Sequence, residues 1–139
     1  MPNPSPSSGE PPYAIIIDPE EGLVLLTMYG VVSGPDLLNA AKEVHEDESW
    51  ENGFDVIWDC SRVHSHIVAP EDVPPLIEEE TDHCEGHDYV IQSPAENEHV
   101  LADLLARLCR RGGKSMSVHA DMDGVLRSLG RESLPASLT

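Results

Sequence analysis

Short aliphatic runs that alternate with capped, amphipathic stretches constrain the fold of this chain more than any other feature. The runs are rich in valine, isoleucine and leucine and have the length of single strands, while the stretches between them space apolar residues as helices do. The predicted strands are 13–18, 22–30, 54–60, 88–92 and 115–120, and the predicted helices are 34–46, 69–84, 94–112 and 121–130. This β-β-α-β-α-β-α-β-α order favours a single α/β domain with a mostly parallel sheet of five strands.

The two ends of the chain differ in composition from its middle. The first dozen residues, MPNPSPSSGEPP, hold five prolines and no apolar cluster, so they cannot bury enough surface to offset the entropy of ordering. We therefore expect residues 1–12 to be a disordered tail, residues 13–130 to form a folded domain and residues 131–139 to be a flexible tail. Within the domain, the turn sequence DPEEG at 18–22 should join the first two strands as an N-terminal hairpin.

Capping residues mark the helix boundaries. Ser33 can cap the first helix, and Asp36 stands at the return position of the capping box. Ser93 is placed to cap the third helix, with Pro94 in the first helical position, where a missing amide hydrogen does no harm. Gly112 should end that helix.

The acidity of the chain limits its partners. It holds 26 aspartates and glutamates against 8 lysines and arginines, a formal net charge of −18. Nucleic acid is repelled by such a chain, because binding requires clustered cations that displace counterions. The charge also suggests adaptation to a salt-rich cytoplasm, since at about 1 M salt a Debye length near 3 Å would screen the self-repulsion.

Cysteine content and hydropathy bear on location. Cys60, Cys84 and Cys109 form no CxxC pair and are odd in number, which argues against a disulfide framework and for a reducing compartment. The longest aliphatic stretches, AIII and LVLL, are far shorter than a membrane span, and no basic start precedes an apolar run. We expect a cytoplasmic protein that does not insert into membranes.

The sequence DCSRVHSH at 59–66 concentrates reactive side chains in eight positions. The alternation of FDVIWDC predicts a strand with one buried face that ends at Asp59 and Cys60. Residues 61–66 would then form an exposed polar loop. No G-x-S-x-G elbow surrounds Ser61 or Cys60, so we expect the thiol to pack in the core and the hydroxyl to bond loop amides, without catalysis.

Two pairs of histidines raise a metal-binding alternative. His64 and His66 would share a face in an extended segment, and His83 and His87 have the spacing of one helical turn. The pairs cannot form one site, because about 12 helical residues would separate them by roughly 18 Å. Each pair lacks a clear fourth ligand. We therefore assign no metal and no cofactor.

The element order, together with DVIWDCSRV, HDYVIQSPAENEHVLADLLARL and SMSVHADMDGVLRSLG, resembles the SpoIIAA-like family, bacterial relatives of STAS domains with the anti-sigma-factor antagonist fold. The likeness spans roughly residues 12–130 and includes Asp59, Ser61 and Val63 as an Asp-x-Ser-x-Val strand end. In the antagonists a partner kinase phosphorylates a serine in the Asp-Ser-Ser-Gly turn that follows this strand. Here positions 67–70 read IVAP, without a serine. The resemblance therefore implies a non-catalytic binding module that lacks this phosphoswitch.

Ligands of open α/β sheets bind at the carboxyl ends of the parallel strands. We therefore predict a non-catalytic regulatory or interaction module that binds a protein partner or a small ligand at this edge. The residues expected there are Asp59, Ser61, His64, Ser65, His66, Ser93 and His119. The alternatives are a carrier of a lipid or other apolar ligand and a metal-binding protein that uses one of the histidine pairs. A homodimer is also compatible with the sequence.

Overall fold

The computed structural model describes residues 11–83, 85–93, 106 and 115–139. Its strands are β1 (Tyr13–Asp18), β2 (Leu23–Ser33), β3 (Asp55–Ile67), β4 (Asp88–Ile91) and β5 (Met116–His119), and its helices are α1 (Gly34–Glu46), α2 (Val73–His83) and α4 (Met122–Leu129). Short 3₁₀ turns span Pro70–Asp72 and Ala136–Leu138. The predicted third helix, 94–112, and its capping pattern lie outside the described residues apart from Ala106.

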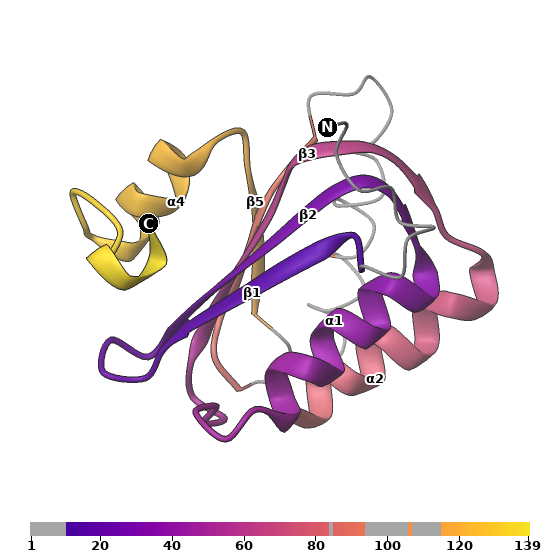
Figure 1. The fold of residues 1–139 in the computed structure, drawn as a ribbon, viewed down its shortest axis with the longest axis horizontal. Coiled ribbons are helices and arrows are strands. Elements are labelled where there is room, and N and C mark those ends of the chain that lie inside the picture. The colour runs from indigo at the N-terminus through magenta and orange to yellow at the C-terminus, as the bar shows by residue number, and fades with distance from the viewer. Residues whose placement is uncertain (1–10, 84, 94–105, 107–114) are drawn as a thin grey trace, which may run out of the picture.

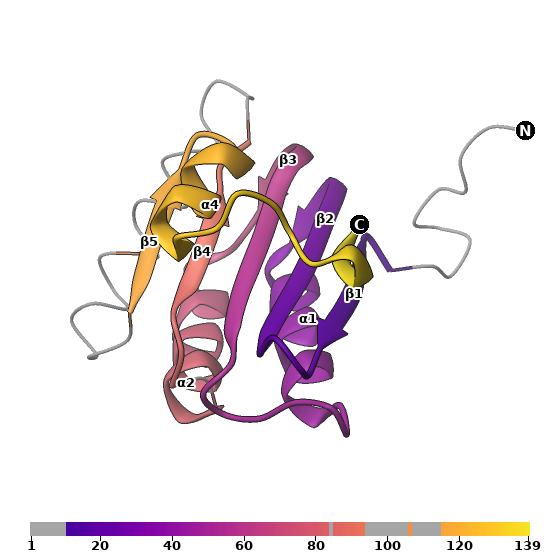
Figure 2. The ribbon, with the colours of Figure 1, turned by 90° about the vertical axis from the view of Figure 1, so that its left-hand side faces the viewer.

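The five strands form one sheet in the order β1-β2-β3-β4-β5. β1 and β2 pair antiparallel as the predicted N-terminal hairpin, and β2 to β5 run parallel. In Figures 1 and 2, α1 and α2 lie side by side on one face of the sheet, while α4 and the C-terminal segment lie on the other. The predicted single α/β domain with a mostly parallel five-stranded sheet is therefore confirmed.

Alternation along the strands supplies a core on each face of the sheet. Leu26 and Trp58 belong to the cluster beneath α1 and α2, whereas their neighbours Leu25 and Ile57 belong to the cluster beneath α4, together with Val125. All five side chains are at most 9% exposed. Each buried aliphatic side chain of this size stabilises the fold by about 1.5–3 kcal/mol, so the alternating pattern fixes which face of each strand meets which helices.

β3 is longer than the sequence predicts. It continues past Cys60 to Ile67, so residues 61–66 are strand and not the expected loop. The reason is β2, which runs to Ser33 and pairs with β3 over this length. Register shifts between Thr27 and Tyr29 and between Gly30 and Val31 place an extra residue in β3 each time. These bulges break the period-two pattern by which a strand is recognised.

The far halves of β2 and β3 extend beyond their neighbours. β1 pairs with β2 only as far as Met28, and β4 pairs with β3 only as far as Asp59. We call the remaining segments, Tyr29–Ser33 of β2 and Ser61–Ile67 of β3, the distal arm. Among the described residues, the two segments of the arm have only each other as paired strands.

Capping interactions mark the start of α1, as predicted, and both ends of α4. The Ser33 hydroxyl accepts a hydrogen bond from the Asp36 amide at 3.2 Å, and the Ser33 amide donates to Asp36 Oδ2 at 2.9 Å, which completes the capping box. At α4 the Asp121 carboxylate accepts from the Gly124 amide at 2.9 Å. Gly130 closes that helix with a φ of 72°, a conformation that favours glycine.

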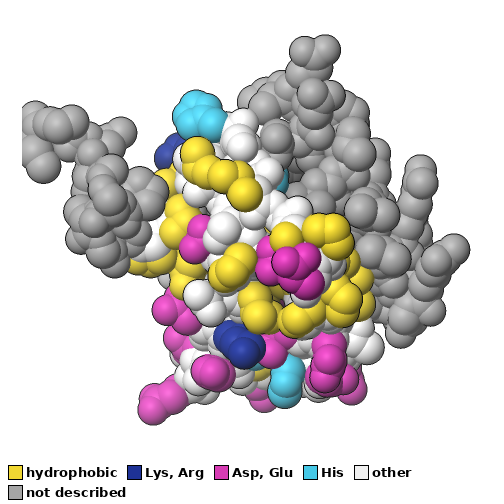
Figure 3. Space-filling view, turned by 90° about the vertical axis from the view of Figure 1, so that its right-hand side faces the viewer, with side chains coloured by type: hydrophobic (Ala, Val, Ile, Leu, Met, Phe, Trp, Pro, Cys, Tyr) yellow, Lys and Arg dark blue, Asp and Glu magenta, His cyan; other side chains and the backbone are white. Residues whose placement is uncertain are grey.

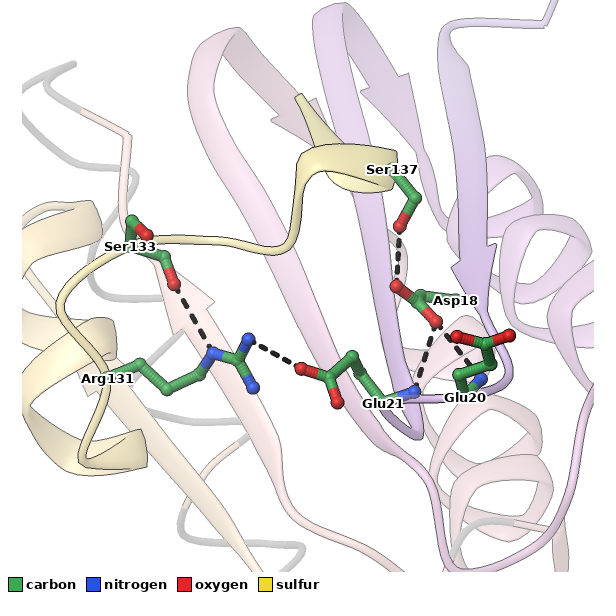
Figure 4. Close-up of polar contacts among 6 residues, drawn as sticks. All are labelled: Asp18, Glu20, Glu21, Arg131, Ser133 and Ser137. Carbon is green, nitrogen blue, oxygen red and sulfur yellow. Dashed lines mark hydrogen bonds and ion pairs between the residues drawn. The ribbon is translucent and has the colours of Figure 1, made fainter.

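Residues 131–139, expected to be a flexible tail, pack onto the sheet in the structure. The segment crosses the α4 face towards β1 (Figure 2), and Leu138 is only 2% exposed within the second core. In Figure 4 the Arg131 guanidinium donates to Glu21 Oε1 at 2.8 Å and the Ser137 hydroxyl donates to Asp18 Oδ2 at 2.6 Å. The segment is packed because Leu138 is buried and because Arg131 and Ser137 contact the β1–β2 turn. The composition of residues 131–139 alone does not reveal these long-range contacts.

Candidate functional site

The distal arm carries most of the exposed large apolar side chains. Among the residues that the structure describes, four large hydrophobic side chains are exposed: Ile67 at 63%, Val31 at 49%, Ile16 at 41% and Tyr29 at 40%. Three of these four belong to the arm, and the register places Tyr29 opposite Arg62 and Val31 opposite Ser65. An apolar patch that remains open to solvent on a monomer is typical of an interaction surface.

The arm also differs from the rest of the chain in charge. Its two segments, YGVVS and SRVHSHI, contain none of the 26 acidic residues but hold Arg62, His64 and His66. In Figure 3, which shows this side of the molecule, hydrophobic side chains extend from the upper part to the centre, with histidine and basic side chains at the top, while acidic side chains lie at the centre and below, where basic and histidine side chains also occur. The two arm segments therefore carry no acidic side chain, on a chain with a net charge of −18.

Five of the seven predicted site residues lie on β3 in or beside the arm. Ser61 donates to Asp59 Oδ1 twice, from its amide at 3.0 Å and from its hydroxyl at 2.6 Å. His64 is exposed, while Ser65 and His66 are half-buried. The Asp59 carboxylate thus holds Ser61 at the start of the arm. The two histidines, His64 and His66, lie further along β3.

The other two predicted residues serve elsewhere. Ser93 is 5% exposed, and its hydroxyl donates to the Val63 carbonyl at 2.6 Å. Because β4 ends at Ile91, the Val63 carbonyl cannot pair with that strand, and Ser93 supplies a partner for it. His119 shares a row of the sheet with Asp59 but lies two strands away, with Ile91 between them, which is roughly 10 Å.

Sequence reasoning missed a cluster on the α4 face, where His119 meets Ser117, which was not selected, and His87, which was paired instead with His83. Ser117 Oγ lies 2.7 Å from His87 Nε2 and 2.8 Å from His119 Nε2. The Tyr89 ring contacts both imidazoles, with centroid distances of 4.3 Å to His87 and 5.8 Å to His119. We call His87, Ser117 and His119 the imidazole cluster. Alternation in SMSVHA puts Ser117 and His119 on one face, but only the pairing of β4 with β5 brings His87 to them.

Burial changes the proton affinity of two groups in this region. The pKa of His119 is lowered, because burial disfavours the imidazolium more than the nearby Asp121 carboxylate favours it. The pKa of Tyr89 is raised by burial first and by the Asp55 carboxylate second. Both groups are therefore neutral at pH 7.

A bulge interrupts the extended segment that holds one predicted histidine pair, and the helix expected to hold the other pair ends before its second histidine. His64 has no register partner in β2, because it is the extra residue at the second bulge, so it and His66 do not follow simple alternation. α2 ends at His83, whose Nε2 is 4.0 Å from Glu79 Oε2, while His87 bonds Ser117. Within the described part of the chain, no three His, Cys, Asp or Glu side chains are arranged to hold a metal ion.

Two alternative roles do not fit the described residues. One is Cys60 as a nucleophile, and the other is a pocket that carries an apolar ligand. Burial raises the pKa of Cys60 to about 12, so the thiol stays protonated at neutral pH and is a poor nucleophile. A pocket of about 470 Å³ between β1 and α1 is lined by Ile15, Ile17, Glu43, Asp47 and Ser49. Two carboxylates in its wall disfavour an acyl chain. Within the described ranges, no helix has the length and apolar character needed to cross a membrane.

Comparison with known proteins identifies relatives in fold. No protein-family model and no curated protein matches the chain. The anti-sigma factor antagonist SpoIIAA in its unphosphorylated form is 11% identical, with a TM-score of 0.48 over 85% of this chain and 98% of that one. An uncharacterized DUF3478-family protein with a SpoIIAA-like fold, from Shewanella loihica PV-4, is 10% identical, with a TM-score of 0.51 over 81% of this chain and 89% of that one. The chain has a SpoIIAA-like fold, as the resemblance in sequence predicted.

Proposed function

We propose that this chain is a regulatory interaction module without catalytic activity, and that it binds a protein partner through the distal arm. The SpoIIAA-like fold supports this, because the sequence resemblance to the SpoIIAA-like family implies a non-catalytic binding module. The fold alone does not define a surface. The arm supplies one at the carboxyl edge of the sheet, where ligands of open α/β sheets bind.

The observation that carries the proposal is the combination of apolar exposure and missing acids on the arm. Tyr29, Val31 and Ile67 are each at least 40% exposed, and Arg62 stands beside Tyr29 in the register. The centres of protein interfaces are enriched in tyrosine, arginine and apolar side chains and depleted in aspartate and glutamate. The arm has this composition on a chain that is acidic elsewhere.

The same charges define the partner. Arg62 and the two arm histidines favour a surface with an apolar centre and carboxylates at its rim, because complementary charges steer association and suppress wrong partners. A second copy of this chain is a poor occupant, since two molecules with a net charge of −18 repel each other. The proposal is therefore a different protein, and sedimentation of the purified chain should show a monomer.

A binding measurement with matched variants tests the proposal. Once a partner is isolated by cross-linking, its affinity is measured for the wild type, Val31→Glu, Ile67→Glu and the control Ile16→Glu. The two arm variants should weaken binding at least about tenfold, which corresponds to 1.4 kcal/mol. Ile16→Glu alters an isoleucine outside the arm that is also exposed, at 41%, and should bind normally. Normal binding by both arm variants, or an equal loss in the control, contradicts the proposal.

The proposal includes a cytoplasmic location. Cys60 is a free, buried thiol, which fits a compartment in which thiols remain reduced. Fractionation of the cells that produce the protein should recover it with cytoplasmic markers. Recovery in a secreted or periplasmic fraction contradicts this part of the proposal.

A further inference from the structure

We propose that the imidazole cluster binds a divalent transition-metal cation of the class that prefers imidazole nitrogen, with Zn²⁺ as the test ion. This site lies on the α4 face of β4 and β5 and is separate from the distal arm. The inference rests on the convergence of two histidine nitrogens from different elements on one point, and it does not depend on the proposed partner.

The geometry of the cluster is close to that of a metal site. His87 Nε2 and His119 Nε2 lie 2.7 and 2.8 Å from the same atom, Ser117 Oγ. A cation at that point requires Zn–N distances of about 2.0–2.1 Å, so each ring would have to move by roughly 0.7 Å. Rotation of Ser117 about its Cα–Cβ bond frees the point between the rings and leaves the hydroxyl able to bind from the side.

The surrounding structure holds the two rings in place. Ser117 lies directly opposite Tyr89 in the sheet, and the Tyr89 ring contacts both imidazoles. On its other side His119 meets the first turn of α4, where a Cβ on Gly124 would lie 3.4 Å from His119 Nδ1. Ligands that packing already orients lose less entropy on binding a metal.

The local charge also favours a cation. The Asp55 carboxylate accepts a hydrogen bond from the His87 amide at 2.8 Å, and Asp121 begins α4 two residues after His119. Both carboxylates make the potential at the cluster more favourable for a positive ion.

The ligand set defines the kind of site. Two imidazoles and one hydroxyl leave coordination positions for water, which resembles an open, exchangeable site more than a closed structural one. Imidazole ligands suit zinc, copper and nickel better than magnesium or calcium. We therefore expect reversible binding of Zn²⁺ and no response to Mg²⁺.

Calorimetric titration of the full chain with ZnCl₂ tests the site. His87→Ala and His119→Ala should each weaken binding at least about tenfold, while His64→Ala, an exposed histidine of the arm, should bind as the wild type does. His83→Ala controls for the group that His83 forms with Glu79 and His45. Loss of binding in His83→Ala but not in His119→Ala, or no binding by the wild type, overturns the proposal. Circular dichroism verifies that each variant is folded.

A second variant tests the point of convergence directly. Ser117→Cys would place a thiolate between the two imidazoles and create a Cys-His₂ ligand set, to be measured with Co²⁺ as a spectroscopic substitute for zinc. We expect tighter binding than in the wild type and thiolate-to-cobalt absorption that is absent from Ser117→Ala. A folded Ser117→Cys protein that shows no such absorption would mean that the rings do not converge on position 117, and the proposal would fail.

Discussion

His45 is a titratable residue enclosed between helices. Its side chain is 3% exposed, its Nδ1 lies 2.7 Å from Glu79 Oε2 on α2, and its ring contacts Trp50 at a centroid distance of 5.0 Å. Burial lowers the pKa of His45, and the Glu79 and Asp88 carboxylates only partly oppose this effect, while His83 adds to it. His45 is therefore neutral in the folded protein at pH 7.

This burial predicts a loss of stability in acid. Because the pKa of His45 is lower in the folded than in the unfolded state, the unfolded chain binds more protons once the pH falls below about 6.5, the unfolded pKa. The free energy of unfolding should therefore be constant for this group above that pH and decrease as the pH falls towards the lower folded pKa. Urea titrations from about pH 7.5 to about pH 5.5 measure it.

A matched pair of variants assigns the effect. His45→Gln should reduce the dependence of unfolding free energy on pH in this window, whereas His64→Gln, which alters an exposed histidine, should preserve it. If His45→Gln retains the full acid-induced loss of stability, another group is responsible and the assignment is wrong.

Ser93 links two elements of the sheet, because its hydroxyl joins β3 to the chain that follows β4. Its bond to the Val63 carbonyl at 2.6 Å is buried, and an unpaired buried polar group costs about 1–3 kcal/mol. Ser93→Ala should lower the free energy of unfolding by that amount in urea denaturation. Ser61→Ala, which removes an exposed bond to Asp59, should change it by less than about 0.5 kcal/mol. Equal effects of the two substitutions would contradict this role for Ser93.

The elements that sequence reasoning predicted well are those specified by local residues. The capping box of Ser33 and Asp36 begins α1, and the Asp121 cap begins α4, because these interactions lie within three or four residues. The far half of β3 was predicted as a loop because the cause of its extension is distant: SRVHSH becomes strand through pairing with β2 and interrupts its own alternation with two bulges.

The candidate site was predicted in part for the same reason. The carboxyl edge of the sheet follows from element order, and Asp59 to His66 lie on the part of β3 that approaches it. Tyr29 and Val31 were not selected, since an aliphatic strand gives no sign that side chains near its end remain exposed. Only the register, which pairs Tyr29 with Arg62, shows that apolar and basic side chains share one surface. The imidazole cluster required the pairing of β4 with β5.

At the scale of the whole molecule, the C-terminal segment closes the second core. Leu138 is 2% exposed and packs in the same cluster as Leu25 and Ile57. Leu138→Ala should lower the free energy of unfolding by about 2–4 kcal/mol, through lost burial and the cavity that remains. Leu134→Ala alters a partly buried leucine of the same segment and should cost less. A loss below 0.5 kcal/mol for Leu138→Ala, near the level of surface substitutions, would contradict the packed position of this segment.

The net charge of −18 should make the stability of the whole molecule depend on salt concentration. Like charges destabilise the compact state, and salt at about 1 M reduces the Debye length to roughly 3 Å. The melting temperature should therefore rise from dilute buffer to molar KCl. A melting temperature that does not change with salt would refute the hypothesis of adaptation to a salt-rich cytoplasm.

Site-specific photo-cross-linking in the producing cells tests whether the distal arm is the surface that binds a partner. A photoreactive amino acid is placed at Val31 of the arm in one protein and at Ile16 of β1 in another, because these side chains are similarly exposed, at 49% and 41%. We predict a discrete adduct with another protein from position 31 that is absent from position 16. No adduct from position 31, or the same adducts from both positions, would contradict the account.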